Sequence, residues 1–443
     1  MDYALDKSFF LRPFIRNIAW TVIALTVGSG VVGGLRRGLH DEPDWRSFYR
    51  ESQHVWEYRE IPPATGMFGY LPTTFFALWP FTVSSPAEFG LITFVALNLA
   101  AAVVVLVILR RYWFASDEGP DARLFVWPLF LGVAHFQHPL QANQFTLWVL
   151  VLCVIGLTLL MHKREWSGGL VLGLAGCLKL TPFIFLIYAL CRRRWRAVGG
   201  MVLAIIVFDL VPSVAFFGWD GAIREHRNWL RRVEWYSARR LIEDPNLRVL
   251  RHGNNCSYAL VLARWLRSPA EADQQVVLRG DPPDSVIDAT RSSLAPNEFL
   301  TLDPMPPAEG DWVVQRHDLS DHSRVPRFHV ADLSANAVWL IWAGTLIVGL
   351  TAACLATIRC RQSSPGTDGW RTEAALWMLL MLWPTPMLRD YYLALTFPAF
   401  VVFWRTLLLR WDSLSPYGRV FAAGAIAVVY LSVPAMASHL ANW

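Results

Sequence analysis

Long apolar runs alternate with short polar segments along most of the chain. A helix that crosses the hydrocarbon core of a bilayer needs about 17 to 25 residues, and most of the runs have that length. The runs carry few charges, whereas the segments between them are rich in arginine, aspartate and glutamate. We predict membrane spans at about 14–35, 88–109, 124–138, 144–161, 197–217, 333–357, 372–388, 391–410 and 418–440, with a further apolar region at 168–191.

Composition agrees with this pattern. Of the 443 residues, 54% are hydrophobic and 17% are charged, and the mean hydropathy is +0.33. These values exclude a soluble multi-domain protein and indicate a polytopic membrane protein. The net charge of +5 is modest, and we expect no nucleic acid partner. The predicted fold class is an all-α polytopic membrane protein with about 9–11 transmembrane helices.

The positions of the basic residues predict the topology. Cytoplasmic loops carry an excess of Lys and Arg, so the basic residues before the first span place the N-terminus in the cytoplasm. Later basic clusters at 110–111, 163–164, 192–194 and 359–361 all fall on the cytoplasmic side if region 168–191 enters the bilayer and returns. We therefore expect this region to reverse at the Lys-Leu-Thr-Pro sequence of 179–182, because proline interrupts helices.

The same pattern divides the chain into three parts. Residues 1–217 form an N-terminal transmembrane module with an outer loop at 36–87, residues 218–332 form an extracytoplasmic loop, and residues 333–443 form C-terminal helices. Within the large loop, 268–332 is rich in Pro, Asp and Ser and predicts a small irregular or β-containing insertion. The cysteines show neither a disulfide framework nor zinc-site spacing, so we expect no metal.

The first outer loop holds the strongest candidate for chemistry, Asp44. The sequence from Asp44 onward predicts a short helix that places Asp44, Phe48 and Glu51 near one face, with Asp44 close to the N-terminus. Backbone amides at a helix start keep a carboxylate ionised. Asp44 is therefore a candidate general base, and a purely capping role is an equally good explanation of the pattern.

Lys179 is a second candidate, because it lies in the middle of an apolar region. A cation there costs on the order of 3 kcal/mol on insertion scales, so it is expected to face a polar cavity or an anion. The alternative is a lysine that extends its side chain from a helix end to the interface.

Two further polar clusters are expected on the outer face. The stretch 135–144 carries two histidines and several amides, and its alternative explanation is helix capping and helix–helix hydrogen bonding. The stretch 382–392 carries an Arg-Asp pair and two tyrosines, for which an interfacial tyrosine belt is the alternative.

Several motifs together resemble glycosyltransferase family 87. These are Asp44 with Tyr49, Tyr70-Leu71-Pro72 with Pro80, the turn Asn143-Gln144, Gly173-Leu174-Ala175 before Lys179-Leu180-Thr181-Pro182, and Asn255-Cys256-Ser257. The resemblance implies a GT-C fold helical bundle with a catalytic first outer loop and an active site on the extracytoplasmic side of the cytoplasmic membrane. It also implies a polyprenyl-phosphate sugar as donor substrate, of mannose or, in a sister branch, arabinose. This sequence departs from the family at Asn143, where Gly is frequent, and near Asp390 and Tyr391, where some relatives have His.

The resemblance assigns the role of base to Asp44. For the donor phosphate we expect a cation from Lys179, Arg389 or Arg251. The acceptor or pocket candidates are Tyr49, Tyr70, His138, Asn143, Gln144, Asn255, Asp390 and Tyr391. No cofactor is expected besides the donor, and the expected partners are membrane lipids and a lipid-linked or glycan acceptor.

The predicted function is thus transfer of a sugar, mannose in the first instance, to an acceptor hydroxyl with inversion. Arabinosyl transfer by the same fold is one alternative. A transporter or flippase of lipid-linked saccharides is another, because broken helices and a lysine in apolar surroundings also suit a transporter. A non-catalytic assembly subunit is the third, and it leaves the outer polar clusters without a role.

Overall fold

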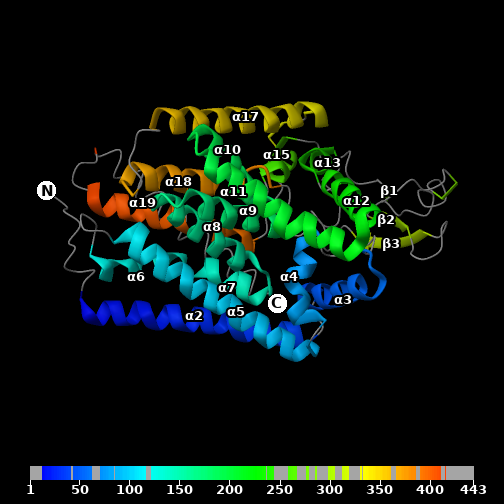
Figure 1. Ribbon diagram of the computed structural model, residues 1–443, viewed down its shortest axis with the longest axis horizontal. Coiled ribbons are helices and arrows are strands. Elements are labelled where there is room, and N and C mark those ends of the chain that lie inside the picture. Colours follow the sequence, from blue (N-terminus) through cyan, green and yellow to red (C-terminus); the bar gives the residue numbers. More distant parts are fainter. Residues whose placement is uncertain are drawn as a thin grey trace. The chain divides into compact units, whose positions relative to one another are not determined.

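The structure is a computed structural model in which the described residues fall into two compact units (Figure 1). The first unit takes its described residues from 1–229, 351–382 and 391–443, and the second from 230–350 and 383–390. The described residues are 12–40, 43–61, 70–83, 85–115, 121–235, 237–243, 258–266, 276–278, 285–286, 298–304, 312–318, 330–331, 333–360, 366–385, 390–410 and 415.

Long apolar helices dominate the described chain, which confirms the predicted all-α polytopic membrane fold. Four described helices are long and apolar enough to cross a membrane: Pro13–Leu39, Ala87–Phe114, Trp195–Leu230 and Ala335–Arg359. Shorter apolar helices occupy Ala122–Gly132, Thr146–Met161, Glu165–Leu178, Thr181–Cys191 and Ala394–Leu409. The predicted span 418–440 lies outside the described residues.

The N-terminal helices of the first unit begin and end close to their predicted bounds, with one difference. The stretch predicted as a single span at 124–138 is divided into short pieces. Pro128, which has no backbone N–H to donate, lies in the first turn of the middle piece, and Gly132 ends that piece. The helices here are α2 (Pro13–Leu39), α3 (Pro43–Tyr58), α4 (Thr73–Thr82), α5 (Ala87–Ile108), η1 (Leu109–Phe114), η2 (Ala122–Phe125), α6 (Val126–Gly132) and α7 (Ala134–Gln141).

The next helices confirm the predicted reversal of region 168–191. They are α8 (Thr146–Met161), α9 (Glu165–Leu178), η3 (Thr181–Phe183), α10 (Ile184–Cys191) and α11 (Trp195–Ile205). Gly169 packs directly on the backbone of Ala197, and Gly173, one turn later, packs on Met201, so α9 and α11 run in the same direction. Arg194 donates to the carbonyl oxygen of Leu160 (2.8 Å), which brings the basic turns before α9 and before α11 to the same end of the unit.

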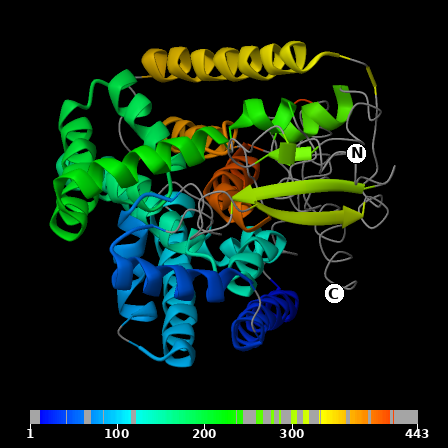
Figure 2. The same ribbon diagram turned by 90° about the vertical axis from the view of Figure 1, so that its right-hand side faces the viewer.

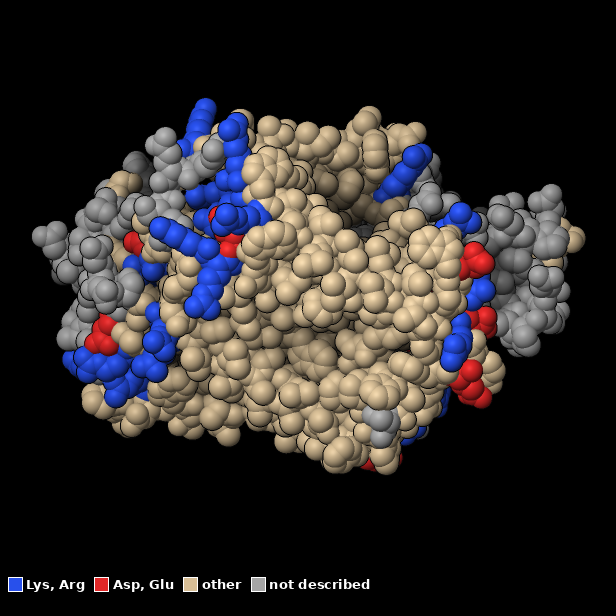
Figure 3. Space-filling view, in the orientation of Figure 1, with Lys and Arg blue, Asp and Glu red and all other residues tan. Residues whose placement is uncertain are grey.

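We call this end of the first unit the basic end, and the opposite end, where α8 begins and α9 finishes, the site end. Figure 3 shows Lys and Arg side chains gathered at the left of the face that it draws, beside a wide uncharged area. The Arg192 guanidinium forms a buried ion pair with Glu373 at the basic end. This pair joins the end of α10 to α18 (Asp368–Leu380).

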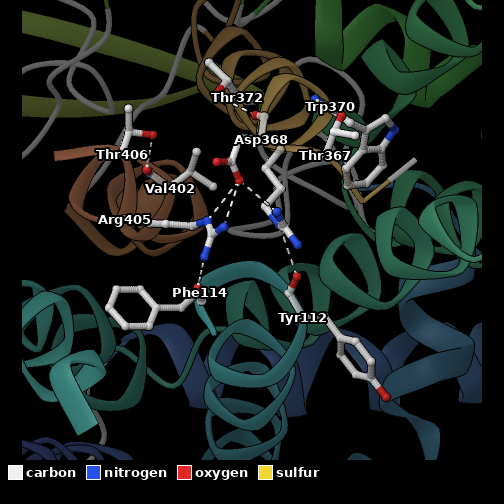
Figure 4. A network of polar contacts seen from close by, with 10 residues as sticks. Tyr112, Phe114, Thr367, Asp368, Trp370, Thr372, Val402, Arg405 and Thr406 are labelled. Carbon is white, nitrogen blue, oxygen red and sulfur yellow. Dashed lines mark hydrogen bonds and ion pairs between the residues drawn. The ribbon is translucent and has the colours of Figure 1, made fainter. Parts of the chain in front are cut away.

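A second polar network at the basic end fastens the C-terminal helices (Figure 4). One carboxylate oxygen of Asp368 accepts hydrogen bonds from Arg371 (2.9 Å) and from Arg405 on α19 (Phe397–Arg410), through Nε at 3.1 Å and Nη2 at 2.9 Å. The two arginines also donate to the carbonyl oxygens of Tyr112 and Phe114 in the π-helical segment η1. Two of the final carbonyls of this long helix are therefore satisfied by side chains.

The helices after α10 contact the segment between α3 and α4. Here α11 continues through the π-helical segment η4 (Ile206–Leu210) into α12 (Val211–Trp235), which bends at Gly218. Gly218 has a φ of 73° and a ψ of 172°, a conformation that only glycine adopts at low cost. The bend lets residues on its two sides contact one another, as described below.

The second unit contains a small sheet, whose strands lie within 268–332, the stretch predicted to be a small irregular or β-containing insertion. Strand β2 (Glu298–Pro304) pairs parallel with β1 (Val276–Leu278) and antiparallel with β3 (Trp312–Asp318). Figure 2 shows β2 and β3 as the paired arrows. Helices α13 (Ala238–Glu243) and α15 (Tyr258–Leu266) bury a small apolar cluster with Val338 on α17 (Ala335–Arg359). The predicted divisions at 217 and 332 stay predictions.

Candidate functional site

The helix α3, which carries Asp44, is anchored by its apolar face. Trp45 is buried and packs on Phe94 of α5, with ring centroids 5.3 Å apart, and Phe48 is buried against Phe145 at the start of α8, at 5.6 Å. The backbone of Asp44 therefore lies in the first turn of a helix whose next turn contacts the site end. The side chain of Asp44 lies outside the described part of the structure, so its role as a base stays a prediction.

Two of the predicted pocket residues meet at the site end. The Tyr70 hydroxyl donates to the Oε1 atom of Gln144 at 3.3 Å, although 74 positions separate them in the chain. The Tyr70 ring also lies 4.9 Å from the ring of Phe145, and Gln144 is buried. The loop after α3 and the turn before α8 thus form one polar cluster.

Lys179 joins the same cluster from the end of α9. Its side chain is only 4% exposed, and its Nζ atom donates to the Oγ1 of Thr146 at 3.0 Å. The ammonium lies 3.6 Å from the ring centroid of Tyr392 and 5.9 Å from that of Phe145. A lysine that extended to the interface would be exposed, whereas this one is directed into the protein.

The structure thus brings Tyr70, Gln144 and Lys179 together around Phe145, and we call these four residues the Phe145 cluster. Tyr392 adds an aromatic face over the cation, a contact that is favourable by about 2 kcal/mol when the cation is desolvated. The sequence interpretation named Asp390 and Tyr391, two positions and one position earlier. The structure describes the backbone of both in the helical turn η8 (Asp390–Thr396) but neither side chain.

Other predicted pocket residues hold helices in place. Asn143 donates from Nδ2 to the carbonyl oxygen of Gly34 on α2 (2.8 Å) and has a φ of 50°. Asn tolerates this left-handed conformation better than most residues. Tyr49 donates to the carbonyl oxygen of Ser85 (3.4 Å), and His138 is buried within α7.

Three predicted site residues lie outside the described residues, namely Arg251, Asn255 and Arg389. Among the described residues, no group of three or more His, Cys, Asp or Glu side chains is placed to hold a metal ion.

The sequence interpretation missed a buried carboxylate, Asp209, in η4. Its Oδ1 accepts hydrogen bonds from the hydroxyl (2.7 Å) and the backbone N–H (3.3 Å) of Thr73, the first residue of α4. Its Oδ2 lies 2.8 Å from Nε2 of His226, whose Nδ1 lies 2.8 Å from the carbonyl oxygen of Ala222. Both ring nitrogens face acceptors, an arrangement that a protonated imidazole satisfies. Asp209 lies inside the apolar run 197–217. A charged residue in an apolar run is expected to have a polar partner, and this argument, which identified Lys179, applies to Asp209 as well.

An apolar pocket of about 420 Å³ lies beside this carboxylate. It is lined by residues of α4, α8, α9, η4 and the start of α12, and Thr73 and Phe208 place its wall next to Asp209. The first unit thus has a buried polar cluster and an apolar pocket built on the same elements.

This region of the chain matches a known protein family. The model of glycosyltransferase family 87 matches residues 68–277, which confirms the resemblance predicted from the sequence motifs. The match contains the whole Phe145 cluster together with Asp209 and His226. It begins after Asp44 and Tyr49 and ends before Arg389, Asp390 and Tyr391, so the family model does not reach those candidates.

Two curated relatives match part of the chain. An alpha-(1->3)-arabinofuranosyltransferase of Corynebacterium glutamicum is 32% identical over 135 residues, which cover 29% of this chain and 30% of the relative. A polyprenol-phosphate-mannose-dependent alpha-(1-2)-phosphatidylinositol mannoside mannosyltransferase of Mycobacterium tuberculosis is 28% identical over 186 residues, which cover 40% of this chain and 41% of the relative. The chain therefore matches less than half the length of either relative. No solved structure matches the chain.

Proposed function

We propose that this chain transfers a sugar from a polyprenyl-phosphate donor to a hydroxyl of a lipid or glycan acceptor, at the extracytoplasmic face of the cytoplasmic membrane. Mannose is the sugar proposed first. The observation that carries the proposal is the Phe145 cluster, a buried cation among hydrogen-bonding side chains inside the stretch that matches a glycosyltransferase family. The mannosyltransferase relative, named for its dependence on polyprenol-phosphate-mannose, supports the donor class.

The reaction needs a base and a cation, and the chain offers candidates for both. Asp44 takes the proton from the acceptor hydroxyl as the acceptor oxygen bonds to the anomeric carbon. The bond from that carbon to the phosphate oxygen breaks, and polyprenyl phosphate leaves with the electron pair. Lys179 stabilises the negative charge that develops on the phosphate, since a preorganised cation in a desolvated site acts more strongly than one in water. A base on the face opposite the leaving group gives inversion.

Arabinosyl transfer is the second candidate, because the arabinofuranosyltransferase relative is 32% identical against 28% for the mannosyltransferase. Both reactions use the same chemical roles and differ in the sugar that the pocket accepts. The two candidates are distinguished by which donor is consumed.

The test is transfer by the purified chain in detergent or nanodiscs. Synthetic polyprenyl-phosphate mannose and polyprenyl-phosphate arabinose are supplied separately with a membrane lipid extract, and products are identified by mass spectrometry. We expect a glycosylated product and free polyprenyl phosphate from one of the two donors. If the protein consumes neither donor but moves a fluorescent lipid-linked saccharide across a vesicle membrane, the transporter alternative is correct and the proposal is wrong.

A further inference from the structure

The apolar pocket beside Asp209 has no role in the chemistry described so far. Its wall consists largely of aliphatic and aromatic side chains, many of them half-buried, from α4, α8, α9, η4 and the start of α12. Those used below are Ala77 on α4, Trp148 and Leu152 on α8, Leu174 and Leu178 on α9, and Phe208 on η4. A volume of about 420 Å³ is within the range of small-molecule sites.

At three places in the chain, a residue that lines the pocket lies within four positions of a residue of the Phe145 cluster. Thr73 follows Tyr70 by three residues, Trp148 follows Gln144 by four, and Leu178 directly precedes Lys179. The Thr74 hydroxyl also donates to the carbonyl oxygen of Leu178 (3.4 Å), which ties α4 to the end of α9 at this point. A ligand with a polar head at the cluster would therefore need to extend its apolar part only a short way to reach the pocket.

The pocket exposes little polar side-chain surface. The hydroxyl of Thr73 is bonded to Asp209, which is bonded in turn to His226, and the unpaired Nε1 of Trp148 is buried and exposes almost no surface. The pocket therefore presents hydrocarbon and aromatic surface to whatever enters it. A group with unsatisfied ester or hydroxyl oxygens would lose hydrogen bonds to water on entry without replacing them.

We propose that this pocket binds the isoprenoid chain of the lipid donor, at the isoprene units nearest the phosphate. This inference rests on the proposed function, because it concerns the same donor. In a polyprenyl phosphate the hydrocarbon begins directly at the phosphate, which suits a pocket that starts beside the cluster. In a phospholipid, glycerol and two ester groups separate the phosphate from the acyl chains, and the pocket has no free polar group to receive them.

The volume limits how much of the chain is bound. A cavity of about 150 Å³ holds one benzene molecule, so the pocket has room for roughly three groups of five or six carbons. Donor affinity should therefore rise as the chain lengthens from one to about three isoprene units and change little beyond that. Each methylene-sized group that is excluded from the pocket should weaken binding about fourfold.

The experiment fills the pocket and measures how the donor KM depends on chain length. Ala77→Trp places an indole in the pocket, and Leu174→Ala enlarges it, so the second variant tests the inference if the first fails to fold. Val207→Trp is the matched control, because Val207 lies next to Phe208 and is exposed on the outer surface of the same helix. Donors carry one, three or ten isoprene units and the same sugar.

We expect wild type and Val207→Trp to show a KM that falls at least about tenfold between one and three units. We expect Ala77→Trp to lose most of this dependence through a higher KM for the longer donors, while the one-unit donor, which fills least of the pocket, is affected least. An unchanged dependence in Ala77→Trp, an equal loss for all three donors, or a change in the acceptor KM instead would each overturn the inference. So would a loss of the dependence in Val207→Trp.

A second measurement separates this inference from the proposed function. Decaprenyl phosphate with a photoactivatable diazirine on its first isoprene unit is bound to the full chain, irradiated, and located by peptide mass spectrometry. We expect adducts on the peptides that contain Trp148 and Phe208, reduced at least about tenfold in Ala77→Trp. Adducts there without any sugar transfer would leave the pocket assignment standing and refute the proposed function, whereas transfer without adducts there would refute the pocket assignment.

Discussion

Replacement of Lys179 by methionine tests the part of the site that the structure describes best. Lys179→Met keeps the length and most of the volume of the side chain but removes its charge. The lost interactions are a charged hydrogen bond to Thr146 and a cation–π contact with Tyr392, which contribute about 1.5–3 and about 2 kcal/mol respectively. These losses are opposed by the desolvation cost of a buried ammonium, which the variant no longer carries.

Folding should therefore survive this substitution. Methionine is apolar and can keep a favourable sulfur–aromatic contact with Tyr392, worth about 0.3–1.5 kcal/mol. We expect the free energy of unfolding to change by less than about 2 kcal/mol. The catalytic effect should be larger, because removal of one preorganised group from a developing anion lowers kcat by about 10² to 10³.

The assay compares kcat for sugar transfer by wild type, Lys179→Met and Lys179→Arg at equal amounts of folded protein. Lys163→Met is the matched control, since Lys163 is an exposed lysine at the basic end. We expect Lys163→Met to behave as wild type and Lys179→Arg to retain part of the activity. If Lys179→Met is folded and turns over at the wild-type rate, the lysine has only a structural role and the cation must be sought elsewhere.

Three other substitutions address separate parts of the molecule. Asp44→Asn should lower the initial rate of transfer by about 10² to 10⁴ without unfolding the protein, because Asn caps a helix as well as Asp but cannot accept a proton. Asn143→Leu should destabilise the protein by about 1–3 kcal/mol in thermal unfolding, since it loses the bond to Gly34 and strains a left-handed residue. Burial alone would raise the pKa of Asp368, but Arg405 and Arg371 lower it, so Asp368→Asn should destabilise the protein by about 1–3 kcal/mol at pH 7.

Each of these has its own control. Asp41→Asn, in the same loop, should keep near-normal turnover, and an equal loss in both variants would remove the special role of Asp44. Asn143→Gly should be milder than Asn143→Leu, because glycine accepts the left-handed conformation. The Asp368 carboxylate has a lowered pKa when folded, so its contribution is present above about pH 4 and disappears as the pH falls through the folded value. A stability difference between wild type and Asp368→Asn that does not shrink as the pH falls below about 4 would contradict this assignment.

Hydrophobic periodicity and charge were enough to predict most of the helices of the first unit. Their bounds follow from the length of apolar runs, and the reversal at 179–182 followed from the positions of basic residues, which the Arg194–Leu160 contact confirms. The division of 124–138 into short helices was not predicted, because its apolar length favoured one span although Pro128 and Gly132 lie within it. Contacts such as that of Tyr70 with Gln144 depend on how distant helices pack, so the sequence gives the candidates without their pairing.

The role of an isolated charge in an apolar run also depends on partners that are remote in sequence. Lys179 and Asp209 have the same sequence signal, yet Lys179 meets Thr146, Phe145 and Tyr392 while Asp209 meets Thr73 and His226. These partners of Lys179 carry no charge, so its ammonium remains a cation in the Phe145 cluster. The partners of Asp209 surround its carboxylate with hydrogen bonds and fix the start of α4.

The contacts of Asp209 bear directly on Asp44. The backbone N–H of Ile61 donates to buried Glu225 (3.4 Å), one position before His226, while Thr73 is held by Asp209. Residues on the two sides of the bend at Gly218 therefore hold both ends of the segment that joins α3 to α4. Since α3 carries Asp44 in its first turn, the placement of this candidate base depends on polar contacts made by η4 and α12. Asp44 precedes the family match, but these anchoring residues lie within it, so the matched stretch contains part of what orients the predicted base.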